Sequence, residues 1–180
     1  MADEIEKKFR LTREQYERLA RDLEELGAEF TGEEREENLI YSSGSLLRDS
    51  SVLRIRRTGN GATLTFKKWV PLEGDLKKHI EHETGIDDPD EAAAMLELLG
   101  LELAVVYEKK RRTWQVLDAE VVLDELPFGF YMEIEGDPPA IREVEMKLAS
   151  DDLEHEPLTY PRLTEKFGVR RDSAIEARFG

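Results

Sequence analysis

The sequence contains no cysteine, so disulfide bonds, thiolate metal sites and cysteine nucleophiles are all excluded. It also lacks any run that approaches the roughly 20 apolar residues of a membrane-spanning helix. The opening Met-Ala-Asp-Glu has neither the basic nor the apolar region of a secretion signal. We therefore expect a cytoplasmic protein.

Basic residues are in the minority. Lysine and arginine number 26 against 41 aspartates and glutamates, which gives a formal net charge of −15. This charge disfavours nonspecific attraction to nucleic acids or anionic membranes, so we expect neither as a partner, and any basic site must be local. The length of 180 residues favours a single domain over residues 1–180. No feature of the sequence predicts an oligomeric state.

Charged side chains occupy alternate positions of the first predicted strand. Because a strand sends successive side chains to opposite faces, Glu4, Glu6 and Lys8 share one face, and Ile5 and Phe9 share the other. Alone, this stretch is most simply a half-buried strand whose charged face meets water. The alternation recurs, however, in later predicted strands at residues 52–57, 62–69, 78–85, 105–114, 119–126 and 129–135. A closed barrel whose charged faces point inward would explain the repetition.

Three amphipathic helices accompany the strands. The first begins at a capping box formed by Thr12 and Gln15, the second at Pro89, and the third after Asp137. We therefore expect an α+β fold, with tunnel strands over about residues 3–136 and a C-terminal helical segment over about residues 138–170.

Four shorter segments carry weaker signals. Residues 33–37 are consistent with a solvated acidic loop, residues 38–41 with a short strand, and residues 42–45 with a turn. The last dozen residues have the composition of a frayed end.

The predicted inward faces carry nearly balanced charges. The acids are Glu4, Glu6, Glu81, Glu83, Asp124, Glu133 and Glu135, and the bases are Lys8, Arg54, Arg56, Lys67, Lys109 and Arg111. Burying so many charges without partners costs several kcal/mol each, so the interior must hold water or ligands. Carboxylates suit Mg²⁺ or Mn²⁺, and two such ions would change the interior charge from −1 to about +3. That charge suits a polyanion such as a triphosphate.

The charged segments also occur in a characteristic order. They are Glu4-x-Glu6-x-Lys8, Leu53-Arg54-Ile55-Arg56, Leu64-Thr65-Phe66-Lys67, Tyr107-Glu108-Lys109-Lys110-Arg111 and Glu133-Ile134-Glu135. Together they resemble the CYTH superfamily, also called triphosphate tunnel metalloenzymes, which includes class IV adenylate cyclases, thiamine triphosphatases and inorganic triphosphatases. The resemblance spans about residues 4–160. It implies an eight-stranded antiparallel β-barrel, flanked by helices, that forms a tunnel lined by these charges.

The resemblance further implies roles for individual residues. The matched metal ligands for Mg²⁺ or Mn²⁺ are Glu4, Glu6, Glu133 and Glu135, with Asp124 assigned to the same group. The matched triphosphate-binding residues are Lys8, Arg54, Arg56, Lys67, Lys109 and Arg111. Glu81 and Glu83 match supporting acids that orient the bases or the water around a metal. The predicted catalytic residues are Glu6, through its metal, and Lys67 or Lys109 as general acid.

Two positions depart from the family pattern. His79 stands where many relatives carry an arginine, which predicts a weaker or pH-dependent phosphate contact. Thr159-Tyr160 replaces a late Ser-Tyr, a milder change.

Competing interpretations of single residues are weaker. His79 and His82 are three apart on a predicted strand, so they face opposite sides and do not suit a shared zinc ion. Arginines near Arg56 could contact nucleic acid, but the acidity of the chain argues against it. Trp69 and Trp114 are predicted to lie in the hydrophobic core.

The leading functional hypothesis is a metal-dependent hydrolase. It would cleave a phosphoanhydride bond of inorganic tripolyphosphate or of an organic triphosphate such as thiamine triphosphate. The first alternative is a class IV adenylate cyclase that converts ATP to cyclic AMP and pyrophosphate. The second is a non-catalytic module that binds polyphosphate or nucleotides.

Overall fold

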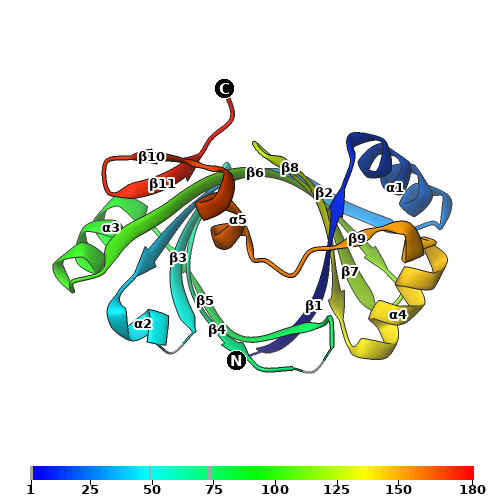
Figure 1. Cartoon of the computed structure of the whole chain (residues 1–180), viewed down its shortest axis with the longest axis horizontal. Coiled ribbons are helices and arrows are strands. Elements are labelled where there is room, and N and C mark those ends of the chain that lie inside the picture. Colours follow the sequence, from blue (N-terminus) through cyan, green and yellow to red (C-terminus); the bar gives the residue numbers. More distant parts are fainter. Residues whose placement is uncertain (1, 49, 73) are drawn as a thin grey trace.

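A closed β-barrel forms the body of the protein. The computed structural model describes residues 2–48, 50–72 and 74–180. The barrel strands are β1 (Ala2–Leu11), β2 (Glu29–Ser42), β3 (Ser51–Thr58), β4 (Gly61–Val70), β5 (Lys77–Ile86), β6 (Glu102–Val116), β7 (Ala119–Leu126) and β8 (Gly129–Gly136). They pair in the order β6-β2-β3-β4-β5-β1-β8-β7, and β7 pairs with β6 to close the ring (Figure 1). All these pairings are antiparallel, so the predicted eight-stranded antiparallel barrel is confirmed.

Helices flank the barrel, as the α+β prediction requires. They are α1 (Arg13–Glu25), α2 (Gly44–Arg48), α3 (Pro89–Leu98), α4 (Pro138–Lys147) and α5 (Tyr160–Phe167). The capping box forms as predicted, because the Thr12 hydroxyl accepts from the Gln15 backbone N–H and the Gln15 side chain accepts from the Thr12 N–H. The turn predicted at residues 42–45 is replaced by the end of β2 at Ser42 and by the start of the short helix α2 at Gly44. None of the described helices is long and apolar enough to cross a membrane.

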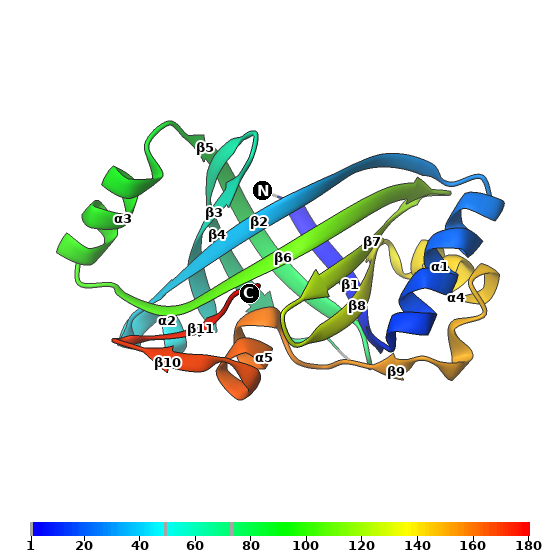
Figure 2. The same ribbon diagram turned by 90° about the horizontal axis from the view of Figure 1, so that it is seen from above.

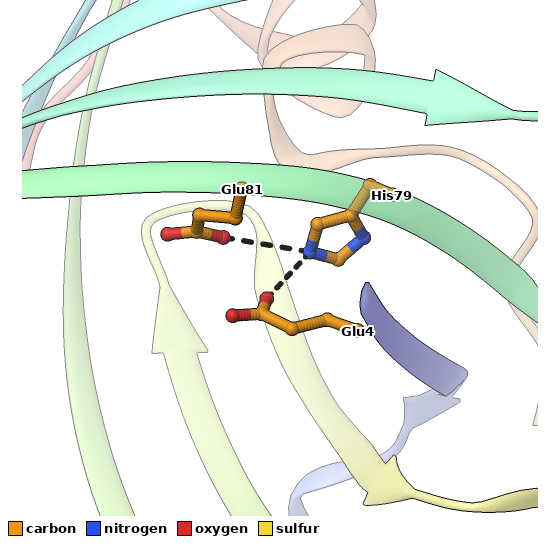
Figure 3. Close-up of side chains that lie close together, drawn as sticks. All are labelled: Glu4, His79 and Glu81. Atoms are coloured by element: carbon orange, nitrogen blue, oxygen red, sulfur yellow. Dashed lines mark hydrogen bonds and ion pairs between the residues drawn. The ribbon is translucent and has the colours of Figure 1, made fainter. Parts of the chain in front are cut away.

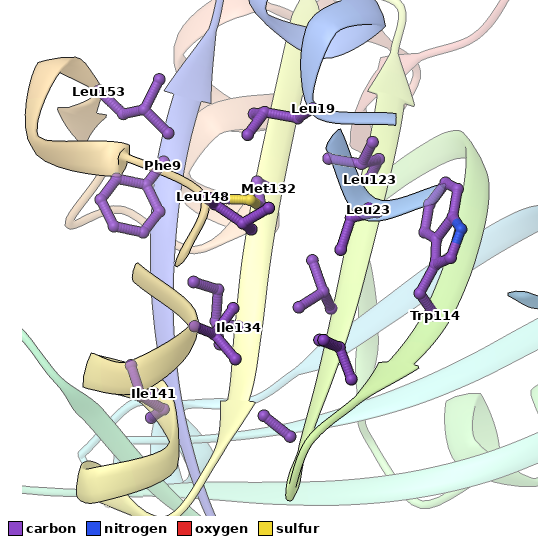
Figure 4. Close-up of a cluster of buried hydrophobic side chains, with 14 of the residues drawn as sticks. Phe9, Leu19, Leu23, Trp114, Leu123, Met132, Ile134, Ile141, Leu148 and Leu153 are labelled. Carbon is purple, nitrogen blue, oxygen red and sulfur yellow. The ribbon is translucent and has the colours of Figure 1, made fainter. Parts of the chain in front are cut away.

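The largest hydrophobic core lies outside the barrel wall. Helices α1 and α4 cover the outer faces of β1, β7 and β8, where Leu19, Met132, Ile134 and Ile141 are fully buried (Figure 4). Trp114 is also fully buried there, so its predicted core position is confirmed. Because apolar side chains point outward to the helices, the alternate, charged side chains must point into the barrel.

The predicted acidic loop at residues 33–37 is wrong. These residues belong to β2, which pairs with β6 along its whole length. Glu36 and Asn38 are almost completely buried, at 1% and 0% exposure. The acidic composition of this segment predicts solvent exposure. Glu36 instead points inward and faces Lys109, with 3.4 Å between the Glu36 Oε2 and Lys109 Nζ atoms.

The predicted frayed C-terminus is also wrong. The strands β10 (Val169–Arg171) and β11 (Ala174–Ala177) form a hairpin, and β11 pairs in parallel with β6. Arg178 then forms ion pairs with Glu37 and Glu176. A further short strand, β9 (Glu154–His155), pairs with β1. Figure 2 shows α5 and the β10-β11 hairpin side by side along one edge of the barrel.

Candidate functional site

Strand alternation brings most of the predicted site residues to one interior surface. A cavity of about 90 Å³ inside the barrel is lined by the predicted residues Glu6, Lys8, Arg54, Lys67, Lys109, Arg111, Glu133 and Glu135. These eight residues come from five strands, and the register places Glu6 opposite Glu135 and Lys8 opposite Glu133. Arg56 instead lines a cavity towards the other end of the barrel, together with Glu34 and Asn60. We call the charged interior the tunnel.

One side of the tunnel has an excess of carboxylates. Glu6 and Glu135 are register partners on β1 and β8, and Glu4 lies two residues before Glu6. Burial raises the pKa of Glu135 to about 7, and the negative charge of Glu4 adds to the effect. Within the described part of the chain, Glu135 has no ion-pair or hydrogen-bond partner. Two facing carboxylates, one of which has a raised pKa and no ion-pair partner, fit a divalent metal ion.

A second acidic cluster contains His79. The His79 Nε2 atom lies 2.7 Å from Glu4 Oε2 and 3.5 Å from Glu81 Oε2 (Figure 3). Burial alone would lower the pKa of His79, but the hydrogen bonds with Glu4 and Glu81 raise it to about 9. Three potential ligand atoms of these side chains lie within 4.8 Å of one another, so the cluster could also hold a metal ion.

The two histidines of β5 do face opposite sides. His82 is exposed whereas His79 is 2% exposed, so the expectation that they cannot share one ion is confirmed. At this position, where the family resemblance led us to expect an arginine, the imidazole of His79 already pairs with carboxylates. Lys67 joins the same cluster through an ion pair with Glu81.

Arginines occupy the next part of the tunnel. Arg54 Nη2 lies 3.7 Å from Glu81 Oε1 and 3.5 Å from Glu83 Oε2, and Arg56 Nη2 lies 2.7 Å from Glu83 Oε2. Each of these two acids thus contacts a predicted phosphate-binding residue. Such contacts fix the orientation of the guanidinium groups before a ligand arrives.

A buried network surrounds Arg111. Its Nε and Nη2 atoms donate to the two oxygens of Asp124 at 2.8 and 2.6 Å, and Nη2 also donates to Glu133 at 2.7 Å. The Tyr160 hydroxyl donates to Asp124 Oδ2 at 2.7 Å. Lys8 Nζ lies 3.0 Å from Glu133 Oε1 and 3.7 Å from the centre of the Tyr160 ring. Asp124 and Glu133, predicted as metal ligands, here act as counter-ions of bases.

Lys109 lies at the centre of these charges. It is 2% exposed, and its Nζ atom lies 3.7 Å from Asp124 Oδ2. Burial and the neighbouring Arg111 lower the pKa of Lys109 to about 8, although Asp124 and Glu36 oppose the shift. Burial alone would raise the pKa of Glu36, but Lys109 and the arginines hold it at about 2.

Several tunnel residues were missed by the sequence analysis. Glu36 and Asn38 continue the alternation of β2, and Lys77 precedes His79 by two residues on β5. Lys77 Nζ lies 3.8 Å from Glu6 Oε1, and burial lowers the pKa of Lys77 to about 8. Extending the alternation of the charged strands by a few residues would have found all three.

Trp69 does not lie in the hydrophobic core, so that prediction is wrong. It shares the inward face of β4 with Thr65 and Lys67 and lines the tunnel cavity. Trp69 lies two residues after Lys67 and therefore on the same face of the strand, a signal that the sequence analysis overlooked.

Comparisons with known proteins agree with this architecture. Residues 2–164 match the CYTH domain. A search of curated proteins found no match. Among solved structures, the PH1012 protein of Pyrococcus horikoshii OT3 is 26% identical, with a TM-score of 0.78 over 89% of this chain and 98% of that protein.

Two similar structures carry descriptions of activity. HpAC1 from Hippeastrum, described as a candidate adenylyl cyclase with a dominant triphosphatase activity, is 18% identical, with a TM-score of 0.71 over 93% of this chain and 97% of that one. A candidate adenylate cyclase from Vibrio parahaemolyticus is 20% identical, with a TM-score of 0.69 over 90% and 97%. At these identities the two structures show a common fold. Because the matched residues span nearly the whole chain, the protein belongs to the CYTH domain family.

Proposed function

We propose that this protein is a divalent-metal-dependent triphosphatase. It would cleave a phosphoanhydride bond of inorganic tripolyphosphate or of an organic triphosphate. The observation that carries the proposal is the position, on one tunnel surface, of the facing carboxylates Glu6 and Glu135 beside a group of buried bases, with no ion-pair partner for Glu135 among the described residues. The triphosphatase activity described for HpAC1 supports the same reaction.

Glu4, Glu6 and Glu135 would hold Mg²⁺ or Mn²⁺, and Glu133 and Asp124 stay predicted as further ligands. Bound metal would neutralise phosphate charge and lower the pKa of an attacking water. Arg111, already oriented by Asp124 and Glu133, would bind phosphate oxygens, as would Arg54 and Lys8.

Lys109 is our choice of general acid. Its pKa of about 8 keeps most of the ammonium protonated at neutral pH, yet the proton leaves more easily than from an ordinary lysine. The proton would pass to the departing phosphate oxygen. Lys67 remains the alternative donor, since it lines the same cavity.

A phosphate-release assay tests the proposal. Tripolyphosphate, thiamine triphosphate and ATP would each be supplied with Mg²⁺, Mn²⁺ or EDTA. We expect metal-dependent release from at least one of them and none in EDTA. No release under either metal would overturn the proposal, and tight binding without turnover in calorimetry would then identify a non-catalytic binding module.

A second candidate function is the class IV adenylate cyclase reaction. The relatives described as adenylate cyclases support it, and the same tunnel charges would serve both reactions. The ribose 3′-hydroxyl of ATP would replace water as the nucleophile, and pyrophosphate would leave. Formation of cyclic AMP in the ATP assay would favour this candidate over hydrolysis.

A further inference from the structure

Lys77 is a base of the tunnel to which the proposed function assigns no role. Its side chain is 13% exposed, and it is the register partner of Glu6, which pairs on its other side with Glu135. Because register partners on adjacent strands lie close together on one face, Lys77 and Glu135 flank Glu6. The carboxylate of Glu6 therefore lies between a cation and a second acid.

The Lys77 ammonium forms its hydrogen bonds with backbone. Nζ donates to Glu156 O at 3.1 Å and to Leu158 O at 3.3 Å, whereas Glu6 Oε1 lies 3.8 Å away. An ammonium has three N–H donors, and these two carbonyls use two of them. A separation of 3.8 Å is an electrostatic contact and not a hydrogen bond. The carbonyls thus hold the charge near Glu6 without placing it on the carboxylate oxygens.

The two carbonyls belong to a segment that leads into α5, residues 156–159, which we call the strap. The strap also bonds to Lys8 on β1. The Glu156 N–H donates to Lys8 O at 2.9 Å, and Lys8 Nζ donates to Leu158 O at 3.4 Å. The strap is therefore bonded to both β1 and β5 directly before the helix that places Tyr160 in the tunnel.

These contacts argue against a role for Lys77 in binding phosphate. Lys8, Lys67 and Lys109 line the tunnel cavity, and Lys77 does not. Moving its ammonium to a phosphate would break two hydrogen bonds to the strap, and a buried carbonyl without a partner is unfavourable. The geometry favours a supporting role.

We propose that Lys77 is a positioning residue that couples the metal site to the strap. Its charge compensates Glu6 in the metal-free protein and competes with a bound metal ion. Its two hydrogen bonds hold the strap, and through the strap they fix Tyr160. The inference rests on the proposed function, because it takes Glu6 as a metal ligand.

Calorimetry with Mg²⁺ alone at pH 7 tests the electrostatic part. Lys77→Met removes a positive charge beside Glu6, so the Kd for Mg²⁺ should fall roughly tenfold. Lys77→Arg keeps the charge and should leave the Kd within about twofold of the wild-type value. Lys68→Met, on the exposed face of β4, is the matched control and should not change the Kd. A Kd that is unchanged or higher in Lys77→Met would overturn the inference.

Hydrogen exchange, measured by mass spectrometry on peptides that cover the strap, tests the structural part. Lys77→Met should speed exchange of the Glu156 and Leu158 amides, because the strap loses two bonds. Lys77→Arg can still donate to the carbonyls and should keep the protection. Equal exchange in the wild type and Lys77→Met would show that Lys77 does not hold the strap.

Kinetics with tripolyphosphate separate positioning from other roles. A loosened strap should raise KM about three- to tenfold in Lys77→Met, while Mg²⁺ binds more tightly. General damage to the fold would weaken both interactions. A direct phosphate contact would raise KM but leave the Kd for Mg²⁺ unchanged. Either of these patterns would contradict the proposal.

Lys77→Gln covers the case in which Lys77→Met does not fold, because glutamine removes the charge but keeps an N–H donor. Its Kd for Mg²⁺ should fall in the same way. If that Kd falls but the wild type releases no phosphate, the proposed triphosphatase is wrong and this inference stands. Phosphate release by the wild type with an unchanged Kd in the charge-removing variants would do the reverse. No binding of Mg²⁺ by any of these proteins would overturn both.

Discussion

At the scale of single residues, the distribution of partners separates binding roles from supporting roles. Most bases of the tunnel already have carboxylate partners, as Arg111 has Asp124 and Glu133. Glu135 is the exception among the acids, because it faces Glu6 and has no ion-pair partner of its own among the described residues. A carboxylate without a cation lowers the stability of the metal-free protein, but it can serve as a ligand when a metal ion binds.

Glu135→Gln should therefore stabilise the metal-free protein at alkaline pH. The pKa of Glu135 is about 7 in the folded state and about 4.3 in an unfolded chain, so wild-type stability relative to the variant should fall as pH rises between these values. At pH 8 the variant should be more stable by roughly 1–2 kcal/mol, after allowance for solvent screening of a partly exposed group.

Denaturation by urea in EDTA at pH 5 and pH 8 measures this difference. Glu143→Gln on the exposed face of α4 is the matched control and should show no such trend. The same Glu135→Gln variant should lose metal-dependent activity. A variant with normal turnover at ordinary Mg²⁺ would show that Glu135 is not a ligand.

Lys109→Arg should keep the charge but remove the proton donor. An arginine stays protonated at all accessible pH values, so kcat should fall about 10²–10³-fold. In the wild type, kcat/KM should decline above about pH 8 as Lys109 loses its proton. Lys110→Arg, on the outer face of β6 beside Glu125, is the control and should leave both properties unchanged. If kcat/KM of Lys109→Arg still declined above about pH 8 as in the wild type, another residue would be the general acid.

At the scale of elements, strand alternation was the most informative signal. It predicted most of the strands and thirteen inward charged positions, eight of which line the tunnel cavity, because charges that share one face of a strand must repeat every second residue. The prediction failed at Glu36, where acidic residues were expected to be exposed to solvent. It also failed at Trp69, where an aromatic side chain was expected to lie in the hydrophobic core. Whether such a side chain is inside depends on cations or cavities contributed by distant strands, which local sequence does not reveal.

The helix α5 is the element whose placement most affects the site, since it carries Tyr160. Gly168 joins α5 to the C-terminal hairpin, and a Cβ atom there would lie 2.6 Å from Thr164 O and 2.8 Å from Glu176 O. Both atoms belong to the backbone, so relief requires the helix or the hairpin to move.

Gly168→Ala should consequently destabilise the protein by about 1–3 kcal/mol. Thermal unfolding measures the change. Gly59→Ala is the matched control, because nothing lies within 4 Å of its added Cβ atom. Equal melting temperatures for the two variants would show that α5 and the hairpin are not held as closely as described.

At the scale of the whole molecule, an acidic protein encloses a site for an anion. The net charge of −15 lies largely on the outside, while Lys8 and Lys109 are buried within and Arg111 is half-buried. Family resemblance predicted the barrel, but not the C-terminal hairpin, which lies beyond the residues that the resemblance spans and pairs with β6 only in the folded barrel.

Ligand binding should stabilise the whole barrel. Mg²⁺ with tripolyphosphate at about 100 times its Kd should add about 2.7 kcal/mol to the free energy of unfolding, because both bind only the folded tunnel. Differential scanning fluorimetry should show a rise in Tm with the pair, and EDTA should abolish it. An equal rise in Glu135→Gln would place the metal elsewhere.

The most direct test of the central claim is product analysis by ³¹P NMR, with tripolyphosphate and ATP supplied in separate tubes with Mg²⁺. The account predicts orthophosphate and pyrophosphate from tripolyphosphate, and from ATP either orthophosphate with ADP or no reaction. Pyrophosphate together with cyclic AMP in the ATP tube would contradict hydrolysis as the main reaction and identify a cyclase.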